Sequence, residues 1–223
     1  MVRIATAAWS VPSKVAQHFA SEGSSLSRYA SVFDGAEINS TFYRRHRVST
    51  FERWAAAVPA CFRFSVREPF RTFLDDIAPL GSKLGPLLCQ LPPSLIFDAD
   101  DARRAFAVMR GGFEGQMVIE PRHSSWGSKV ACGLLKAYRI EPVFADTAPV
   151  WQASDFAAPP AYIRLHGRPK IYYSSYTGAE IAAFAALAGP ESWCVFDNTA
   201  SGAAVENALT MRALALPRPP HDH

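Results

Sequence analysis

The stretch Ala161-Tyr-Ile-Arg-Leu-His166 joins a strand-like apolar run to two ionisable side chains. Successive side chains of a β-strand point to opposite faces of the sheet, so Ile163 and Leu165 lie on one face. Arg164 and His166 lie on the other. A parallel sheet is covered by helices, and Ile and Leu are expected against that helical layer. The pattern therefore predicts a strand that carries an arginine and a histidine on the face turned away from the helices.

Seven other segments have the short, Val-, Ile-, Leu- or Phe-rich composition of strands. They are residues 3–8, 35–41, 62–66, 85–91, 116–121, 142–146 and 193–198. Helical patterns separate them. Ser49-Thr50-Phe51-Glu52 and Thr177-Gly178-Ala179-Glu180 have the form of capping boxes, which satisfy the first amides of a helix. Further apolar stripes at helical spacing occur in residues 26–33, 102–109, 130–138 and 203–214, whereas 151–156 is barely one turn.

Eight strands that alternate with helices require a parallel sheet. In 223 residues the repeat is about 28 residues long, which is the βα unit of a compact barrel. We therefore predict a single (β/α)8 TIM-type barrel over residues 1–216, followed by a frayed, Pro-rich tail over 217–223. A doubly wound open sheet is the alternative. It is disfavoured because no G-x-G-x-x-G follows the first strand and no P-loop occurs.

The same alternation, applied to the other strands, puts polar or ionisable groups on the barrel axis near the carboxyl ends of six strands. These groups are Glu37, Asn39, Arg67, Gln90, Glu120, Arg122, Asp146, Arg164 and His166. Burying an unpaired polar group costs about 1–3 kcal/mol, so an interior of this composition is expected to bind a ligand. Barrel enzymes also keep their sites at this end. For any one residue, a structural salt bridge or a satisfied core histidine is the alternative.

The charges of this candidate site balance, because its three carboxylates face three guanidinium groups, with His123 and His166 titratable near neutrality. No metal-binding motif is present, so no cofactor is implied, and a divalent metal is kept as an alternative. The arginines, with Gln90 and Asn39, suit a carboxylated, phosphorylated or polyhydroxylated ligand. Asn198, which closes the last strand, joins these candidate binding residues. Aromatic residues beyond the strand ends, for which packing is the alternative, could stack on a sugar or base: Trp9, Tyr43, Trp126 and Tyr172.

The composition of the chain limits the kinds of binding partner that we expect. The net charge of +3, from 23 basic and 20 acidic residues, is too small to argue for binding nucleic acid or a membrane surface by charge alone. The chain has no secretory leader pattern and no apolar run long enough to span a membrane, so we expect a cytoplasmic protein. The four cysteines have neither zinc spacing nor the spacing of a disulfide framework. No oligomeric state is predicted.

Six segments occur in the order found in a known family. They are Glu37-Ile-Asn-Ser-Thr-Phe-Tyr43, Phe62-Arg-Phe-Ser-Val66, Leu88-Cys-Gln-Leu-Pro-Pro93, Glu120-Pro-Arg-His-Ser-Ser-Trp126, Tyr162-Ile-Arg-Leu-His-Gly167 and Phe196-Asp-Asn198. Through them the chain resembles the YecE-like family, a domain of unknown function (family 72), over nearly its whole length. The resemblance implies a TIM-type barrel but supplies no substrate, because the family's biochemical role is not established.

The chain departs from the family's usual motifs at several positions. Ala5-Thr-Ala-Ala-Trp9 stands where the family typically has Gly-Thr-Ser-Gly-Trp. Arg67 replaces a lysine, which keeps the charge and excludes Schiff-base chemistry at this position. Thr72-Phe73 replaces a Thr-His pair, and Asp197-Asn198 replaces Asn-Asn. The lost histidine points to an altered substrate or a weakened activity.

We favour an enzyme that acts on a small polar or anionic substrate. Glu120 or Glu37 would be the general acid or base, with His166 as its partner and Asp146 as a further candidate. Hydrolysis, isomerisation and lyase chemistry all stay open. The alternatives are a nucleic-acid-binding barrel of the endonuclease-IV type, by fold analogy alone, or a non-catalytic ligand-binding module. A closed pocket would favour the enzyme, and a basic stripe beside the mouth would favour nucleic acid.

Overall fold

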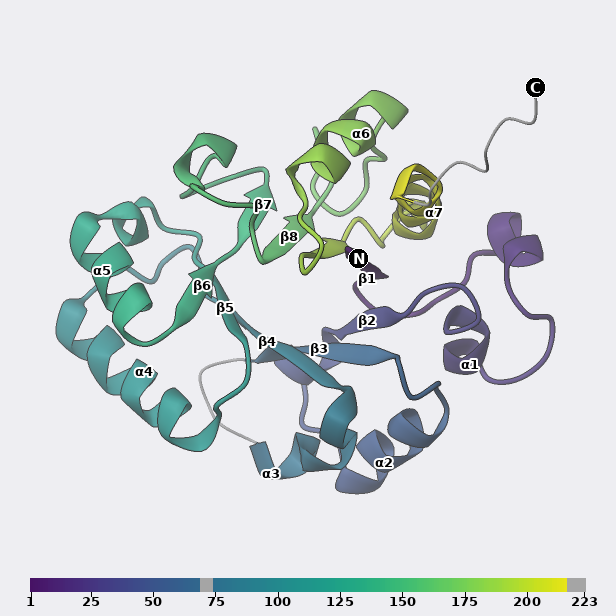
Figure 1. Cartoon of the computed structure of the whole chain (residues 1–223), viewed down its shortest axis with the longest axis horizontal. Coiled ribbons are helices and arrows are strands. Elements are labelled where there is room, and N and C mark those ends of the chain that lie inside the picture. Colours follow the sequence, from purple (N-terminus) through teal and green to yellow (C-terminus); the bar gives the residue numbers. More distant parts are fainter. Residues whose placement is uncertain (69–73, 216–223) are drawn as a thin grey trace.

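The computed structural model describes residues 1–68 and 74–215. Its strands form two parallel sheets, in the orders β1-β9-β8-β7 and β2-β3-β4-β5-β6, with the helices around the outside (Figure 1). The strands are β1 (Arg3–Thr6), β2 (Gly35–Ile38), β3 (Arg63–Glu68), β4 (Leu84–Gln90), β5 (Met117–Glu120), β6 (Ile140–Pro142), β7 (Phe144–Asp146), β8 (Tyr162–Leu165) and β9 (Trp193–Phe196). The predicted α/β fold with parallel strands is confirmed.

Helices lie between most pairs of successive strands. The α-helices are α1 (Ser25–Tyr29), α2 (Val48–Ala56), α3 (Leu74–Ile77), α4 (Ala99–Gly112), α5 (Lys129–Ala137), α6 (Gly178–Leu187) and α7 (Ala203–Ala215). Short 3-10 helices cover Ser13–His18, Ser40–Phe42, Ala78–Lys83, Ser124–Gly127 and Ala153–Asp155. The last of these is a single turn between β7 and β8, in the region where the sequence indicates barely one turn.

The two predicted capping boxes have different outcomes. At the start of α6, the Thr177 hydroxyl accepts from the amide of Glu180, and the Glu180 carboxylate accepts from the amide of Thr177 at 2.8 Å. That box is confirmed. The box predicted from Ser49 is wrong, because α2 already begins at Val48. The preceding Arg47 supplies the extended backbone that starts the helix, so Ser49 lies inside the first turn.

The structure divides the strands between two sheets and does not show the single eight-stranded barrel that the sequence predicts. The predicted sixth strand is split into β6, which pairs with β5, and β7, which pairs with β8. Pro142 lies at the split and has no amide hydrogen to donate to either neighbour. The next residue, Val143, donates its amide to the carbonyl of Ile119 in β5 at 2.9 Å.

The other junction between the sheets lies at β1 and β2. There the residue after β1, Ala7, forms one parallel bridge with Glu37, and Ala8 donates its amide to the Glu37 carbonyl at 2.9 Å. Ala8 has a φ of 76°, which turns the chain out of the extended conformation. The pairing of β1 with β2 therefore stops after one bridge.

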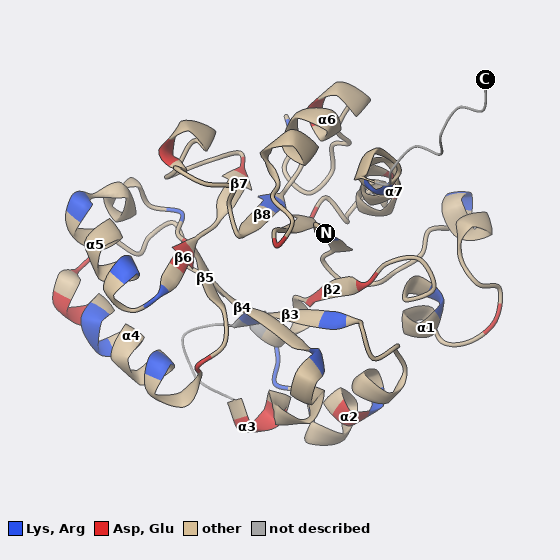
Figure 2. Ribbon diagram, viewed as in Figure 1, with Lys and Arg blue, Asp and Glu red and all other residues tan. Residues whose placement is uncertain are grey.

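The interior divides into an apolar part and a charged part. Ile163 and Leu165 belong to the larger apolar cluster, together with residues from the helices, as their positions in the strand predict. A smaller cluster comes from the alternate strand positions: Ala5, Ala7, Leu88, Val118, Val143, Ala145, Tyr162, Trp193 and Val195. Charged residues lie within β2, β3 and β8 as well as on the outer helices (Figure 2).

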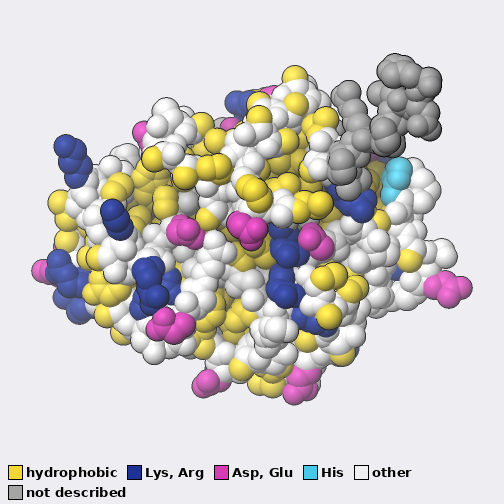
Figure 3. Space-filling view, in the orientation of Figure 1, with side chains coloured by type: hydrophobic (Ala, Val, Ile, Leu, Met, Phe, Trp, Pro, Cys, Tyr) yellow, Lys and Arg dark blue, Asp and Glu magenta, His cyan; other side chains and the backbone are white. Residues whose placement is uncertain are grey.

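Acidic, basic and hydrophobic side chains all reach one face of the molecule (Figure 3). One face of the molecule carries acidic and basic side chains near its centre, with hydrophobic side chains around them (Figure 3). Among the described residues, the helices are all too short or too polar to cross a membrane. The predicted tail, 217–223, and the Thr72-Phe73 departure lie outside the described residues.

Candidate functional site

Arg164, in the middle of β8, is the centre of a buried ionic network. Its side chain has no exposed surface. The guanidinium makes a two-point contact with the carboxylate of Glu37 in β2, with Nε donating to Oε2 at 3.0 Å and Nη2 to Oε1 at 2.7 Å. Glu37 is also completely buried. A charged pair is tolerated in such an interior only when both groups are bonded and their charges cancel, and this geometry supplies both.

Three more acceptors complete the coordination of this guanidinium. The Nη1 atom of Arg164 lies 3.1 Å from Glu120 Oε2 at the end of β5 and 3.1 Å from Gln90 Oε1 at the end of β4. The Nη2 atom also lies 3.1 Å from Asp197 Oδ2, just after β9. Four strands of the two sheets therefore converge on one arginine from a fifth. Strand alternation puts Glu120 and Arg164 one layer deeper than Arg122 and His166, and so predicts that Glu120 reaches Arg164 across the interior. This contact is confirmed.

His166 lies one layer above Arg164, between two carboxylates. Its Nδ1 is 2.9 Å from Asp197 Oδ2, and its Nε2 is 3.0 Å from Glu120 Oε1. Burial lowers the pKa of His166, but the two carboxylates outweigh burial and raise that pKa above the usual 6.5. Both ring nitrogens face carboxylate oxygens, which only accept hydrogen bonds, so both nitrogens donate and the ring is cationic. The same layering of strand positions predicts that His166 lies nearer solvent than Arg164. That prediction is wrong, because the His166 side chain has no exposed surface.

His166 and Arg164 keep Glu120 and Asp197 in their ionised, carboxylate form. Burial by itself raises the pKa of Glu120, but His166 and Arg164 lower it far below its usual value. For Asp197, burial is likewise outweighed by Arg164 and by the hydrogen bond from His166, so its pKa is lowered. Both groups are ionised at neutral pH.

Arg122, two residues beyond Glu120, is a part of the network that reaches the surface. Its Nη2 forms an ion pair with Glu120 Oε1 at 2.6 Å, and its side chain is 14% exposed. The same Nη2 lies 3.0 Å from Nε2 of His166. Because that imidazole is cationic, the two donors share the Glu120 oxygen and do not bond to each other. The Nε atom of Arg122 is buried and has no hydrogen-bond partner within residues 1–68 and 74–215.

Below Arg164, a tyrosine that the sequence analysis missed supports Glu37. The hydroxyl of Tyr162 lies 2.9 Å from Glu37 Oε2 and 2.9 Å from the Ser65 hydroxyl on β3. Burial and the neighbouring Glu37 raise the pKa of Tyr162 well above its usual value, so it stays protonated and donates. Strand alternation could have found it, because Tyr162 has the same parity as Arg164.

Asp146 does not join this network. It accepts a hydrogen bond from the Tyr176 hydroxyl at 2.8 Å and lies 3.5 Å from Arg168. Burial and the Asp146 carboxylate raise the pKa of Tyr176, which therefore remains a donor. The Tyr176 oxygen also accepts the amide of Gly167 at 2.7 Å, so this cluster holds the chain that leaves β8.

The remaining predicted site residues differ in their burial and in the groups that they contact. Asn39 is half-buried, and Arg67 is buried with its guanidinium carbon 5.9 Å from the ring centre of the exposed Tyr43. His123 caps the 3-10 helix Ser124–Gly127 through Nδ1. Trp126 is buried and donates its indole NH to a backbone carbonyl at 3.0 Å.

Asn198 supports the loops behind the site. Its amide nitrogen donates to the carbonyl of Ser174 at 2.9 Å and to Asn207 Oδ1 at 2.8 Å. Within the described part of the chain, its Oδ1 is buried and accepts no hydrogen bond. Asn198 therefore connects the segment after β8 to α7.

The aromatic residues predicted as stacking platforms separate into two pairs. Trp9 packs edge-on against Trp54 with ring centres 5.0 Å apart, and Trp126 packs against Phe97 at 5.1 Å. Both make the ring contacts that the packing alternative predicts. Tyr43 and Tyr172 have 76% and 40% of their surface exposed.

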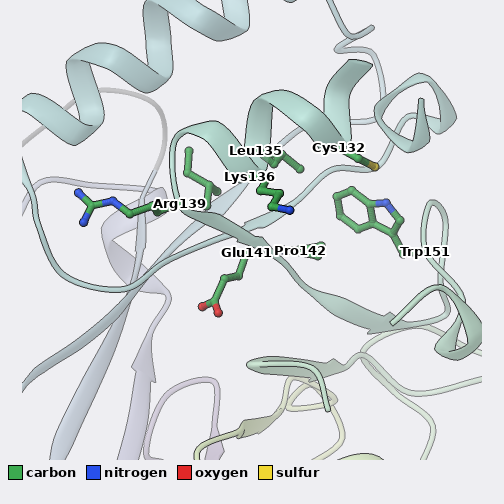
Figure 4. Close-up of a pocket in the computed structure, with 8 residues that line it drawn as sticks. Cys132, Leu135, Lys136, Arg139, Glu141, Pro142 and Trp151 are labelled. Carbon is green, nitrogen blue, oxygen red and sulfur yellow. The ribbon is translucent and has the colours of Figure 1, made fainter. Parts of the chain in front are cut away.

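Metal ligands and cavities were the other features that could mark a functional site. No group of three or more His, Cys, Asp or Glu side chains in the described ranges is arranged to hold a metal. A cavity of about 390 Å³ lies on the helical side of the sheet, between α5 and Trp151 (Figure 4). Its walls include Leu135, Ile140 and Pro142, with Lys136 at the side. None of its lining residues belongs to the network around Arg164.

Fold and site together define a class: a parallel α/β protein with a buried ionic network at the carboxyl ends of its strands. The family model for "Protein of unknown function DUF72" matches residues 3–221. The chain belongs to the DUF72 family, which is the YecE-like family that its motifs resemble.

Two solved structures show the same fold. A DUF72 family protein from Enterococcus faecalis V583 is 22% identical with a TM-score of 0.80, and the match covers 98% of this chain and 97% of that chain. A DUF72 family protein from Thermotoga maritima MSB8 is 21% identical with a TM-score of 0.77, and the match covers 96% and 98%. A comparison with curated proteins found no match.

Proposed function

We propose that the carboxyl ends of the strands bind a small polar or anionic ligand, and that the protein is an enzyme acting on it. The observation that carries this proposal is Arg122. Its terminal nitrogen is anchored on Glu120 at 2.6 Å, whereas its buried Nε meets no acceptor among the residues described. A buried donor without a partner is costly, and a carboxylate or phosphate oxygen of a ligand would satisfy it.

A closed barrel accounts for the position of this site. The bridge between Ala7 and Glu37 joins the two sheets at one junction, and at the other the chain runs directly from β6 through Val143 into β7. In such a barrel the strands would follow one another around a ring, with the network of Arg164 inside it. The mouth at the carboxyl ends is the position of the active site in barrel enzymes.

The network would hold Arg122 rather than react. Glu120 is an ionised carboxylate compensated by Arg164 and His166, so it cannot donate a proton as a general acid at neutral pH. It fixes one end of the Arg122 guanidinium and leaves the other for the ligand. In an enzyme of this design, Arg122 neutralises substrate charge, and Glu120 and His166 are positioning residues. Hydrolysis, isomerisation and lyase chemistry all stay open.

Calorimetric titration with inorganic phosphate at low ionic strength tests the binding step. Replacing Arg122 by glutamine removes a charge-assisted contact worth about 1.5–3 kcal/mol, so R122Q should bind phosphate about 10- to 100-fold more weakly. The matched control is R139Q, because Arg139 is an exposed arginine paired with Glu114 at 2.7 Å. R139Q should bind as the wild type does.

Two results would overturn the proposal. One is equal binding by R122Q and the wild type, which would remove Arg122 from the site. The other is a wild-type protein that binds neither phosphate nor acetate and retains no small molecule in native mass spectrometry. Circular dichroism of R122Q checks that the fold is intact.

A further inference from the structure

The loop that follows β8 carries a backbone conformation that side chains such as tyrosine rarely adopt. Tyr172 has a φ of 70°. Non-glycine residues at positive φ are uncommon, and for bulky residues they carry strain. Glycine or asparagine would accept this conformation more easily. Strain of this kind persists where the surrounding structure enforces it, and it concentrates at functional sites.

The backbone on both sides of Tyr172 enforces the conformation. Its amide donates to the carbonyl of His166 at 2.6 Å, and its carbonyl accepts the amide of Ala200 at 3.1 Å. Gly167 lets the loop fold back closely, because a Cβ at this position would lie 2.5 Å from the carbonyl oxygen of Ser174. The loop is thus tied to the end of β8 and to the segment after β9.

This backbone places the ring of Tyr172 against the network. The ring is edge-on to the His166 imidazole with centres 5.8 Å apart, and 40% of the residue is exposed. The neighbouring Tyr173 makes a different contact, with the Lys170 ammonium 4.2 Å from its ring centre. Of the two adjacent exposed tyrosines, Tyr172 is therefore the one directed at the candidate site.

We propose that Tyr172 is a stacking surface and that the ligand of this site is an anion carrying a flat ring. The inference rests on the proposed function, because it takes Arg122 as the group that binds the anion. Arg122 Nη2 lies 3.0 Å from one nitrogen of His166, and the Tyr172 ring packs on the same imidazole. One small ligand can therefore contact both.

The chemistry of the two groups differs in a way that selects such a ligand. A guanidinium binds carboxylate or phosphate oxygens, and a half-exposed tyrosine ring offers an apolar face with little conformational freedom to lose. An aromatic ring or a nucleobase beside the anionic group gains from stacking on that face, whereas an aliphatic group of the same charge does not.

Phenyl phosphate and methyl phosphate test the inference, because they differ in the flat ring and share the anionic head. Wild-type protein should bind phenyl phosphate about 2- to 10-fold more tightly in calorimetry. Y172N keeps a residue that tolerates positive φ but removes the ring, so it should lose this preference and bind methyl phosphate as before. Y172F keeps the ring and should retain the preference, and Y173N, the matched control, should retain it too.

The outcomes separate the two proposals. Equal binding of both phosphates by the wild type, or a preference that survives in Y172N, overturns the stacking role while the anion site stands. Binding of neither phosphate ester overturns this inference, and the anion site falls with it when inorganic phosphate and acetate also fail to bind and no small molecule is retained. Thermal unfolding of Y172N and Y172F confirms that the variants compared are folded.

Discussion

Replacing Arg164 by methionine would test whether the ionic network holds the fold together. The change removes the guanidinium that bonds Glu37 at two points and contacts Glu120 and Asp197 at 3.1 Å each. Removing one partner of a buried ion pair costs about 3–5 kcal/mol. Because the carboxylates left behind also repel one another, we expect R164M to lose about 5 kcal/mol. That is a large part of the roughly 5–15 kcal/mol that stabilises a domain.

The pH dependence gives this prediction a second readout. In the wild type the pKa values of Glu120 and Asp197 are lowered, so the stability they contribute is present above about pH 4.5 and lost as the pH falls through the lowered values. In R164M we expect burial to prevail at Asp197, which loses the contact that lowers its pKa most, whereas His166 and Arg122 still lower the pKa of Glu120. The variant should then become more stable as the pH falls from about 6.5 to 5, where the wild type is nearly flat.

Urea unfolding followed by far-UV circular dichroism at the two pH values measures both effects. Arg104 pairs with Asp101 on the exposed side of α4, and R104M should cost no more than about 1 kcal/mol. The double variant E37Q/R164M removes one uncompensated charge and should be more stable than R164M. A variant R164M within 1 kcal/mol of the wild type at pH 6.5, or a double variant less stable than R164M, would refute the reasoning.

Three further predictions concern single side chains. Because the pKa of His166 is raised, the stability it contributes is present below about pH 6.5 and lost as the pH rises through the raised value, so H166Q should be less stable at pH 6 and should lose this alkaline slope in urea unfolding from pH 6 to 9. A8G should stabilise the protein by about 0.5–1 kcal/mol in the same assay, because Ala8 has a φ of 76° that glycine adopts without strain. Y29F should cost about 1–3 kcal/mol, because the Tyr29 hydroxyl accepts the Thr6 amide at 3.0 Å and donates to the Gly35 carbonyl at 3.1 Å; an unchanged urea midpoint would contradict the assigned bonds.

Strand alternation predicted which side chains enter the interior. It placed Arg164, Glu37 and Glu120 there because a period of two is a local property of the chain. It could not predict that Glu37 makes the two-point contact with Arg164, since which groups meet across the interior depends on the tilt and stagger of the strands. Nor did it find the split at Pro142, where one strand pairs with a different neighbour in each half.

The error at His166 has a different origin. The sequence places this residue at the end of a strand, where a mouth-lining position is expected. In the structure two residues cover His166. Asp197 comes directly after β9, and Tyr172 lies in the long loop between β8 and α6. In the sequence, Asp197 is recognisable only as a departure from the family's motif. Loop conformations depend on contacts made by residues distant in the chain, and no local pattern reports them.

The order of the network along the chain constrains how the protein is made. The carboxylates of Glu37 and Glu120 are synthesised well before Arg164, and Asp197 and the strand that carries it come near the end. A nascent chain therefore contains acids whose main counter-ion has not yet left the ribosome. Until β8 emerges, Glu37 lacks the guanidinium that pairs with it in the finished interior, so we expect the first five strands to keep that carboxylate hydrated. Synthesis of the last third of the sequence is the step that permits cooperative folding of the whole.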